Sequence, residues 1–162
     1  MKKHSPLLPF GALNSRAAMQ AGATLIEILV TLLILSIGML GMSALQARAI
    51  KGSVSSFQRS QAVIYGQYML DVMRIDRESA KGGDYNTPKI CSSSGITGTT
   101  LAKNSLREWL DSVRANVGSP GDTTTCVAVT CDADYRCTVK IYWDDSRSGG
   151  LSDQTMELAT RV

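Results

Sequence analysis

One acidic residue stands at the edge of the most apolar part of the chain. Glu27 comes directly before residues 28–45, an 18-residue run without a charged side chain. Such a run is long enough to cross a bilayer as a helix. A charge inside a spanning helix costs about 2.5–3.5 kcal/mol on insertion scales and usually has a partner. Glu27 is therefore interpreted either as a carboxylate that meets a cation or as a chance acid near the interface of a simple signal-anchor.

Four cysteines are the other residues with evident chemistry, and all of them follow the apolar run: Cys91, Cys126, Cys131 and Cys137. An even number of cysteines in a small, loop-rich domain is typical of disulfides in an oxidising compartment. A zinc site would need closer paired spacings than the 34, four and five residues that separate them. The cysteines therefore predict disulfides.

Charge and histidine content exclude several classes of function. Residues 1–22 hold Lys2, Lys3 and Arg16 and no acid, which leaves 14 basic residues against 14 acidic ones in the rest. The formal charge of +3 thus belongs to the first 22 residues, and nothing indicates a nucleic-acid partner. The one histidine, His4, also precedes Gly22, so a chain cut there could build no histidine-based triad or metal site. These features argue against an enzyme and call for no cofactor and no metal.

The N-terminal segment is basic but lacks an apolar core of its own. Pro6 and Pro9 interrupt its few apolar residues, and it ends on Gly22. A secretory signal peptide is cut after its apolar core. Here the apolar run follows Gly22, so a cut between Gly22 and Ala23 would keep the membrane segment in the mature chain.

This order resembles the class III leader of type IV prepilins: a basic leader, Gly22, one further residue, the sequence TLIE at residues 24–27, and a hydrophobic helix. Residues 25–30, 38–42, 44–46, 58–62 and 73–74 also resemble the PilV type of minor pilin, and the similarity covers residues 20 to 86 or so. One position departs from the family, because Ala23 stands where these pilins most often have Phe.

The resemblance implies a processing chemistry for these residues. A prepilin peptidase would cleave between Gly22 and Ala23 on the cytoplasmic side and methylate the new amine of Ala23. Glu27 would then neutralise that amine, in its own chain or in a neighbouring subunit, while the helix moves from the membrane into a fibre. Helix physics agrees, because an acid in the first turns of a helix interacts favourably with the helix dipole.

By the same resemblance, the chain would be a minor pilin that joins other minor pilins and pilin subunits. It would prime assembly of a type IV pilus, sit at or near the fibre tip, support adhesion and twitching motility, and could present a tip adhesin. In this family the subunit that lacks this acid takes the outermost place, so the presence of Glu27 implies a neighbouring subunit on the tip side. Two alternatives stay open: a minor pseudopilin of a type II secretion system, and a bitopic periplasmic anchor with a binding domain.

The resemblance also implies a single pass through the inner membrane before assembly, and then the pilus at the cell surface. Flanking charges do not decide the orientation, because three cations precede the run and three follow it at Arg48, Lys51 and Arg59. The four cysteines need an oxidising compartment, which predicts a periplasmic C-terminal domain.

We expect an α+β fold of the type IV pilin kind, in which a long N-terminal helix packs on a small antiparallel β-sheet with disulfides. After a leader of residues 1–22, we expect the helix to lie within residues 23–81 and to be unbroken from about Ala23 to Ala80. Residues 23–46 would be its membrane or fibre-core half, and 47–81 its amphipathic half. Residues 82–162 would form the periplasmic globular domain. In the amphipathic half, one apolar stripe recurs at steps of three, four or seven: Ile50, Val54, Phe57, Ile64, Tyr68, Val72 and Ile75.

Within the globular domain, residues 82–104 are rich in Gly, Ser and Thr and predict a loop. Ser105 and Glu108 have the spacing of a capping box before a short helix, and Trp109 would lie on the apolar face of that helix. Residues 125–130 and 136–143 predict an antiparallel hairpin, and residues 155–162 a third strand.

The hairpin suggests a disulfide pairing. If Cys131 faces Cys137, then Val129 faces Val139 and Val127 faces Ile141, which makes one coherent apolar face. That register leaves Cys91 for Cys126. It is the best of three possible pairings, and the other two stay open because sequence does not fix pairing.

Other residues have two interpretations. Trp143 ends a strand beside Asp144 and Asp145, where a partner contact is possible. These aspartates, with Asp132 and Asp134, favour solvated turns over calcium binding, because the first pair lacks the Gly and distal Glu of a known calcium loop. Two glycines in the apolar run, at residues 38 and 41, fit either local unwinding during assembly or close helix packing in the membrane.

Overall fold

The computed structural model describes residues 22–118 and 122–162. The chain divides into two compact units, residues 1–41 and 42–162, and each is described by itself. Residues 1–21 of the expected leader, and residues 119–121 of the turn expected after the short helix, lie outside the described residues.

The long helix is present and ends slightly earlier than expected. α1 covers Leu25–Ile75, 51 residues, and contributes to both units. α2 (Arg77–Lys81) follows after Asp76, whose φ of −106° and ψ of 54° are not helical. The hydroxyl of buried Tyr85 donates to Asp76 Oδ2 at 3.1 Å and holds this turn. The prediction of one unbroken helix to residue 80 is therefore wrong at Asp76.

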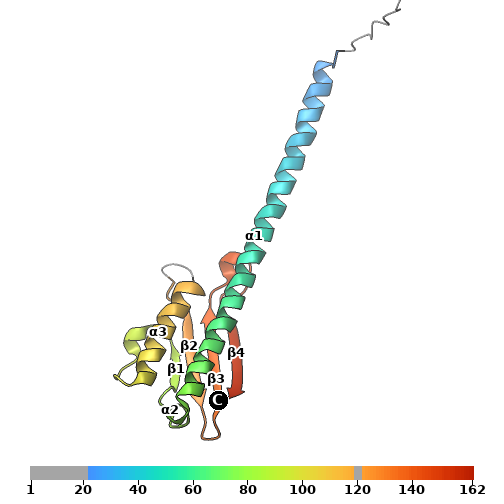
Figure 1. Cartoon of the computed structure of the whole chain (residues 1–162). Coiled ribbons are helices and arrows are strands. Elements are labelled where there is room, and N and C mark those ends of the chain that lie inside the picture. Colours follow the sequence, from blue (N-terminus) through green and yellow to red (C-terminus); the bar gives the residue numbers. More distant parts are fainter. Residues whose placement is uncertain (1–21, 119–121) are drawn as a thin grey trace, which may run out of the picture. The chain divides into compact units, whose positions relative to one another are not determined.

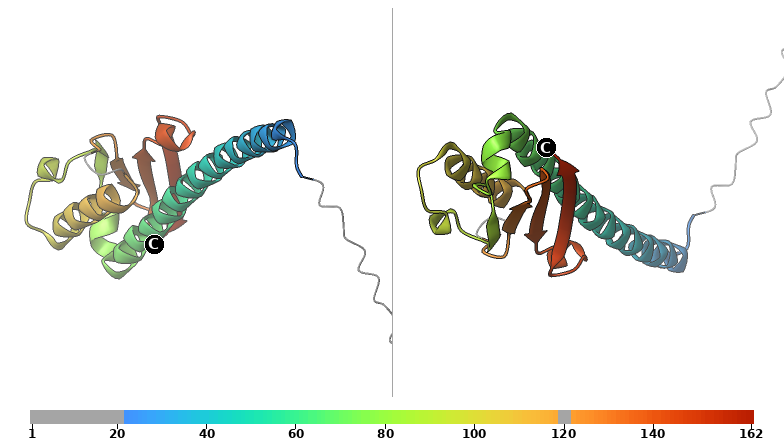
Figure 2. Two further views of the ribbon diagram at one scale, coloured as in Figure 1. Left: turned by 90° about the horizontal axis from the view of Figure 1, so that it is seen from above. Right: turned by 90° about the horizontal axis from the view of Figure 1, so that it is seen from below.

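The second unit contains one antiparallel sheet of four strands in the order β1-β2-β3-β4. The strands are β1 (Thr87–Ile90), β2 (Cys126–Cys131), β3 (Arg136–Trp143) and β4 (Gln154–Arg161). α3 (Leu101–Asn116) and the second-unit part of α1 lie on the same face of this sheet (Figures 1 and 2). Two 3₁₀ helices, η1 (Ser93–Gly95) and η2 (Ser146–Ser148), lie in the connecting loops.

The register predicted for the β2–β3 hairpin is confirmed. Cys131 lies opposite Cys137, and the two apolar pairs follow as expected, Val129 with Val139 and Val127 with Ile141. All six of these residues are buried, because the alternation of an antiparallel strand turns them toward the helices.

The sheet has one strand more than predicted. β1 lies inside residues 82–104, which we expected to be a loop, and it pairs with β2 through Thr87 opposite Val129 and Ile90 opposite Val127. It is only four residues long, includes Pro88, and its register shifts between the two pairs. A strand this short and irregular leaves no alternating pattern in the sequence. It is recognised as a strand only because it pairs with β2.

α3 begins one turn earlier than its sequence signal. Thr100 is the N-cap, and its Oγ1 accepts a hydrogen bond from Lys103 N at 3.3 Å. The predicted cap, Ser105, lies inside the helix. The predicted apolar face is confirmed, because five of its residues are buried in the core: Leu106, Trp109, Leu110, Val113 and Val117.

The apolar stripe of α1 is not the face that packs on the sheet. Six of its seven members are exposed, and only Val72 packs against the core. The buried face uses smaller or more flexible side chains instead: Gln58, Ala62, Gly66, Met69, Leu70 and Met73. Gly66 shows why, since a Cβ there would lie 2.7 Å from Met156 Cε and 2.9 Å from Leu158 Cδ1. A close approach of helix and sheet selects small residues rather than the most apolar ones.

Candidate functional site

The residues predicted for processing lie together at the start of α1. Gly22, Ala23 and Thr24 precede the helix and are exposed. Thr24 caps it, because Glu27 N donates to Thr24 O at 3.0 Å and to Thr24 Oγ1 at 3.4 Å. Ala23 is thereby held one residue before the cap. A new amine there would be close to the first helical turn.

Glu27 lies in the first turn of α1 and is exposed. Across residues 22–118 and 122–162, no side chain forms a hydrogen bond or an ion pair with its carboxylate. The chain therefore gives this charge a favourable place on the helix dipole and no cation of its own.

The helix after Glu27 has the length and composition of a membrane span. Every residue from 25 to 54 is exposed, so this apolar surface has no cover within the described chain. Two of its hydroxyls bond back to the helix, Thr31 Oγ1 to Ile28 O at 2.8 Å and Ser36 Oγ to Leu32 O at 2.6 Å. Internal satisfaction of polar groups is what a lipid environment requires.

Gly38 and Gly41 do not interrupt the helix. Both lie within α1, and a Cβ added at either would meet nothing within 4 Å among the described atoms. Contacts within the chain therefore do not account for them. Unwinding and close packing against another helix both remain consistent with them.

A second apolar surface lies on the part of α1 in the second unit. We call it the α1 seam. It contains Ile50, Val54, Phe57, Ile64, Tyr68 and Ile75, whose exposed fractions run from 45% at Val54 to 89% at Ile75. Steps of four and three, completed by Gln61 and Asp71, give a heptad pattern across residues 50–75. Such a seam is typical of a helix that packs along another helix.

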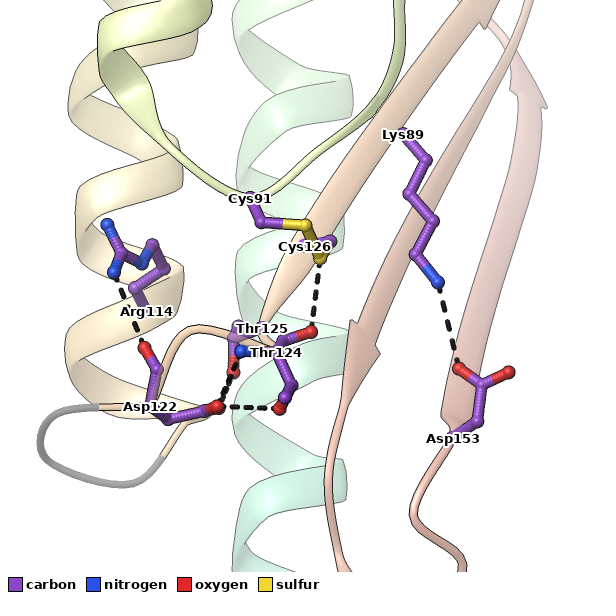
Figure 3. Close-up of a disulfide and its surroundings, with 8 residues drawn as sticks. All are labelled: Lys89, Cys91, Arg114, Asp122, Thr124, Thr125, Cys126 and Asp153. Carbon is purple, nitrogen blue, oxygen red and sulfur yellow. Dashed lines mark hydrogen bonds and ion pairs between the residues drawn. A yellow bond between two sulfur atoms is a disulfide. The ribbon is translucent and has the colours of Figure 1, made fainter.

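Both disulfides follow the pairing favoured by the hairpin register, Cys91 with Cys126 and Cys131 with Cys137. Figure 3 shows the first of them, which joins the end of β1 to the start of β2. The turn just before β2 is held by Asp122, which accepts hydrogen bonds from Thr124 and Thr125 at 2.6 Å. Burial acts to raise the pKa of Asp122, but these hydrogen bonds outweigh it and hold that pKa below the ordinary aspartate value.

One buried carboxylate was missed at the sequence level. Asp145 is 1% exposed, and Ser55 Oγ on α1 donates to its Oδ2 at 2.5 Å. Arg59 Nη2 lies 4.0 Å from the same oxygen. The prediction of a solvated turn is therefore wrong for Asp145, which ties the β3–β4 connection to α1. Only the pair Gly149-Gly150 signalled this tight turn, and a Cβ at Gly150 would clash with Asp145.

Trp143 and the other aspartates can now be placed. Trp143 is buried, at 3% exposure, so the idea that it contacts a partner is wrong. Trp109 is buried as predicted, and its Nε1 donates to Tyr65 O at 2.9 Å. Within the described parts of the chain, no three His, Cys, Asp or Glu side chains are grouped as a metal ion would need.

Comparisons with known proteins give one finding. The family model described as the prokaryotic N-terminal methylation motif matches residues 18–43. No curated protein matches the chain, and no solved structure matches it.

The matched segment includes the proposed cut, Glu27 and most of the apolar run. With a long apolar helix packed on a four-stranded antiparallel sheet and two disulfides, it supports a type IV pilin-like protein. The motif itself supports either a type IV pilin or a pseudopilin. Motif and fold together suggest a structural protein rather than an enzyme. It implies processing by a prepilin peptidase and association with pilins, and it fits a membrane-anchored subunit.

Proposed function

We propose that this protein is a minor pilin that joins other minor pilins to prime type IV pilus assembly, and that it sits at or near the fibre tip to support adhesion and twitching. A prepilin peptidase would cleave between Gly22 and Ala23 and methylate Ala23. The observation that carries the proposal is the Glu27 carboxylate, which lies in the first turn after that cut and lacks a partner within the described chain. A neighbour's N-terminal amine would supply the cation.

Two surfaces support assembly with other subunits. The exposed run around residues 28–45 needs lipid or other helices to cover it. The α1 seam adds a second apolar strip on the globular unit. Removing apolar surface from water contributes about 25 cal/mol per Å², which favours a helix-to-helix contact at the α1 seam.

The first experiment compares cells with and without the gene. Pili sheared from the surface and protein secreted to the medium are scored from the same culture. Loss of pili with normal secretion would support the priming role. Intact pili with failed secretion would move the protein to the minor pseudopilins of type II secretion, and no change in either would favour a simple periplasmic anchor.

The role of Glu27 has its own test. Glu27→Ala should leave leader cleavage intact, as read by the mass of the mature chain, but reduce the amount of the protein in sheared pili. Glu108→Ala, which removes an exposed acid of α3, is the matched control and should assemble normally. Normal incorporation of Glu27→Ala would contradict the assigned role.

A further inference from the structure

The two edges of the sheet are built differently. The β1 edge is four residues long, contains Pro88, has a register shift, and carries Lys89 beside Asp153 at 3.8 Å. Shortness, proline, irregular pairing and lysine are the devices by which proteins block an edge strand. The β4 edge has eight residues in regular register, with no proline and no lysine.

The free backbone groups of β4 can be assigned from its register. Val162 N donates to Tyr135 O at 2.8 Å, so this pair is of the hydrogen-bonded kind. Hydrogen-bonded and non-hydrogen-bonded pairs alternate along an antiparallel ladder. With Arg136 opposite Arg161, the residues of β4 whose N–H and C=O point away from β3 are Thr155, Glu157, Ala159 and Arg161. None of these eight groups has a hydrogen-bond partner among the described residues.

Two hollows lie between this strand and α1. One of about 200 Å³ is lined in part by Val63, Trp143 and Met156. The other, of about 290 Å³, has a mainly polar lining that includes Gln67 and the Asp71–Arg74 ion pair beside Leu158. Met156 and Leu158 are two residues apart, or roughly 6.6 Å along a strand. That spacing matches alternate side chains of an extended chain laid beside β4.

The outer face of the same strand carries unpaired positive charge. Arg136 and Arg161 lie opposite each other, although like charges in that position are destabilising. In the described chain, neither guanidinium makes an ion pair or a hydrogen bond. Both line a hollow of about 550 Å³ with Thr130 and Asp132. The two arginines outnumber this one acid, whose Oδ1 already accepts hydrogen bonds from two backbone N–H groups. Arginine is suited to bind a carboxylate through two hydrogen bonds.

From these features we propose that β4 accepts an extended segment of a different protein as a fifth strand, with an apolar side chain entering the hollow beside Val63 and Met156 and a carboxylate bound by Arg136 and Arg161. Backbone hydrogen bonds give such an interaction its affinity, and the pockets for alternate side chains give its specificity. A second copy could pair only through its own β4, because its other edge is the blocked β1, so dimerisation of the full chain without peptide would overturn the proposal. The inference does not depend on the proposed role in pilus assembly.

The test uses the full chain in detergent micelles and a labelled nine-residue peptide that alternates Val and Thr and ends in two Glu. We expect saturable binding by fluorescence anisotropy. Amide exchange should slow at Thr155, Glu157, Ala159 and Arg161 and stay unchanged at Met156, Leu158 and Thr160, whose amides already bond to β3. Absence of binding up to millimolar peptide, or protection without this alternation, would overturn the proposal.

Substitutions at Ala159 and Arg161 test the backbone contribution and the charge contribution to binding separately. Ala159→Pro removes one outward N–H at an edge position that tolerates proline, and should weaken binding about tenfold, whereas Ala159→Val keeps the N–H and should bind as the wild type does. Arg161→Gln should weaken binding of the Glu peptide about fivefold to tenfold and leave a peptide ending in Gln unaffected. Equal binding by Ala159→Pro and Ala159→Val would contradict strand addition, and thermal unfolding confirms that each variant is folded.

Discussion

At the scale of single residues, Gly66 shows how closely α1 approaches the sheet. A Cβ at this position would meet Met156 and Leu158 within 3 Å, whereas a Cβ at Gly52 of the same helix would meet nothing. We predict that Gly66→Val lowers the free energy of unfolding by about 1–3 kcal/mol through overpacking. Gly52→Ala should not lower it, because a helix gains up to about 1 kcal/mol from that change. Urea denaturation of the two variants measures the difference, and equal effects would contradict the assigned contact.

Tyr85 makes a second prediction at this scale. Burial, the nearby negative charge of Asp76 and the hydrogen bond to Asp76 together raise the pKa of Tyr85 to about 12. Because the folded pKa exceeds the unfolded value of about 10, the stabilisation is complete below pH 10 and is lost as the pH rises toward 12. Ultraviolet titration should show a late tyrosine phase near pH 12. Tyr85→Phe should remove that late phase and weaken the loss of stability between pH 10 and 12.

At the scale of elements, substitutions in the α1 seam should affect association with other subunits without affecting folding. Phe57→Lys with Ile64→Lys changes two exposed side chains, so the free energy of unfolding should move by less than about 0.5 kcal/mol. The same double variant should reduce recovery of the protein with partner subunits in sheared pili, because lysines cannot pack in a helix seam. Ser56→Lys with Ser60→Lys alters an adjacent exposed face and is the matched control. Full recovery of the seam variant would show that the seam is not an assembly surface.

The same elements show what sequence can predict. The register of the β2–β3 hairpin was predictable, because Val127, Val129 and Cys131 stand at every second position and fix which side faces the core. β1 was missed because Pro88 and a register shift erase any such alternation. The apolar stripe of α1 was visible in the sequence, but its exposure was not. Periodicity marks an apolar face without saying what covers it.

Tertiary contacts account for the remaining differences at the site. Glu27 and the disulfide pairing could be anticipated, since a charge in an apolar run and a hairpin register are local patterns. Asp145 could not, because its partners Ser55 and Arg59 lie 90 and 86 positions earlier in the chain. The free edge of β4 likewise depends on where the sheet ends, which only the complete strand order defines.

At the scale of the whole molecule, the first disulfide closes the connection that carries α3 over the sheet. Cys91 follows β1 and Cys126 begins β2, so the bond encloses η1 and α3 in a loop of sequence separation 35, against six for Cys131 and Cys137. Loop-closure entropy then predicts stabilisation of about 4 kcal/mol for the first bond and about 2 kcal/mol for the second.

Replacing each pair by serine tests this difference. Cys91→Ser with Cys126→Ser should lower the free energy of unfolding by roughly twice as much as Cys131→Ser with Cys137→Ser, measured by urea denaturation of the full chain in one detergent. The short-loop variant is the matched control, because it also replaces one disulfide by two serines. A larger loss from the short-loop pair would mean that local packing in the hairpin, rather than closure of the helix-to-sheet connection, dominates the stability that the cysteines provide.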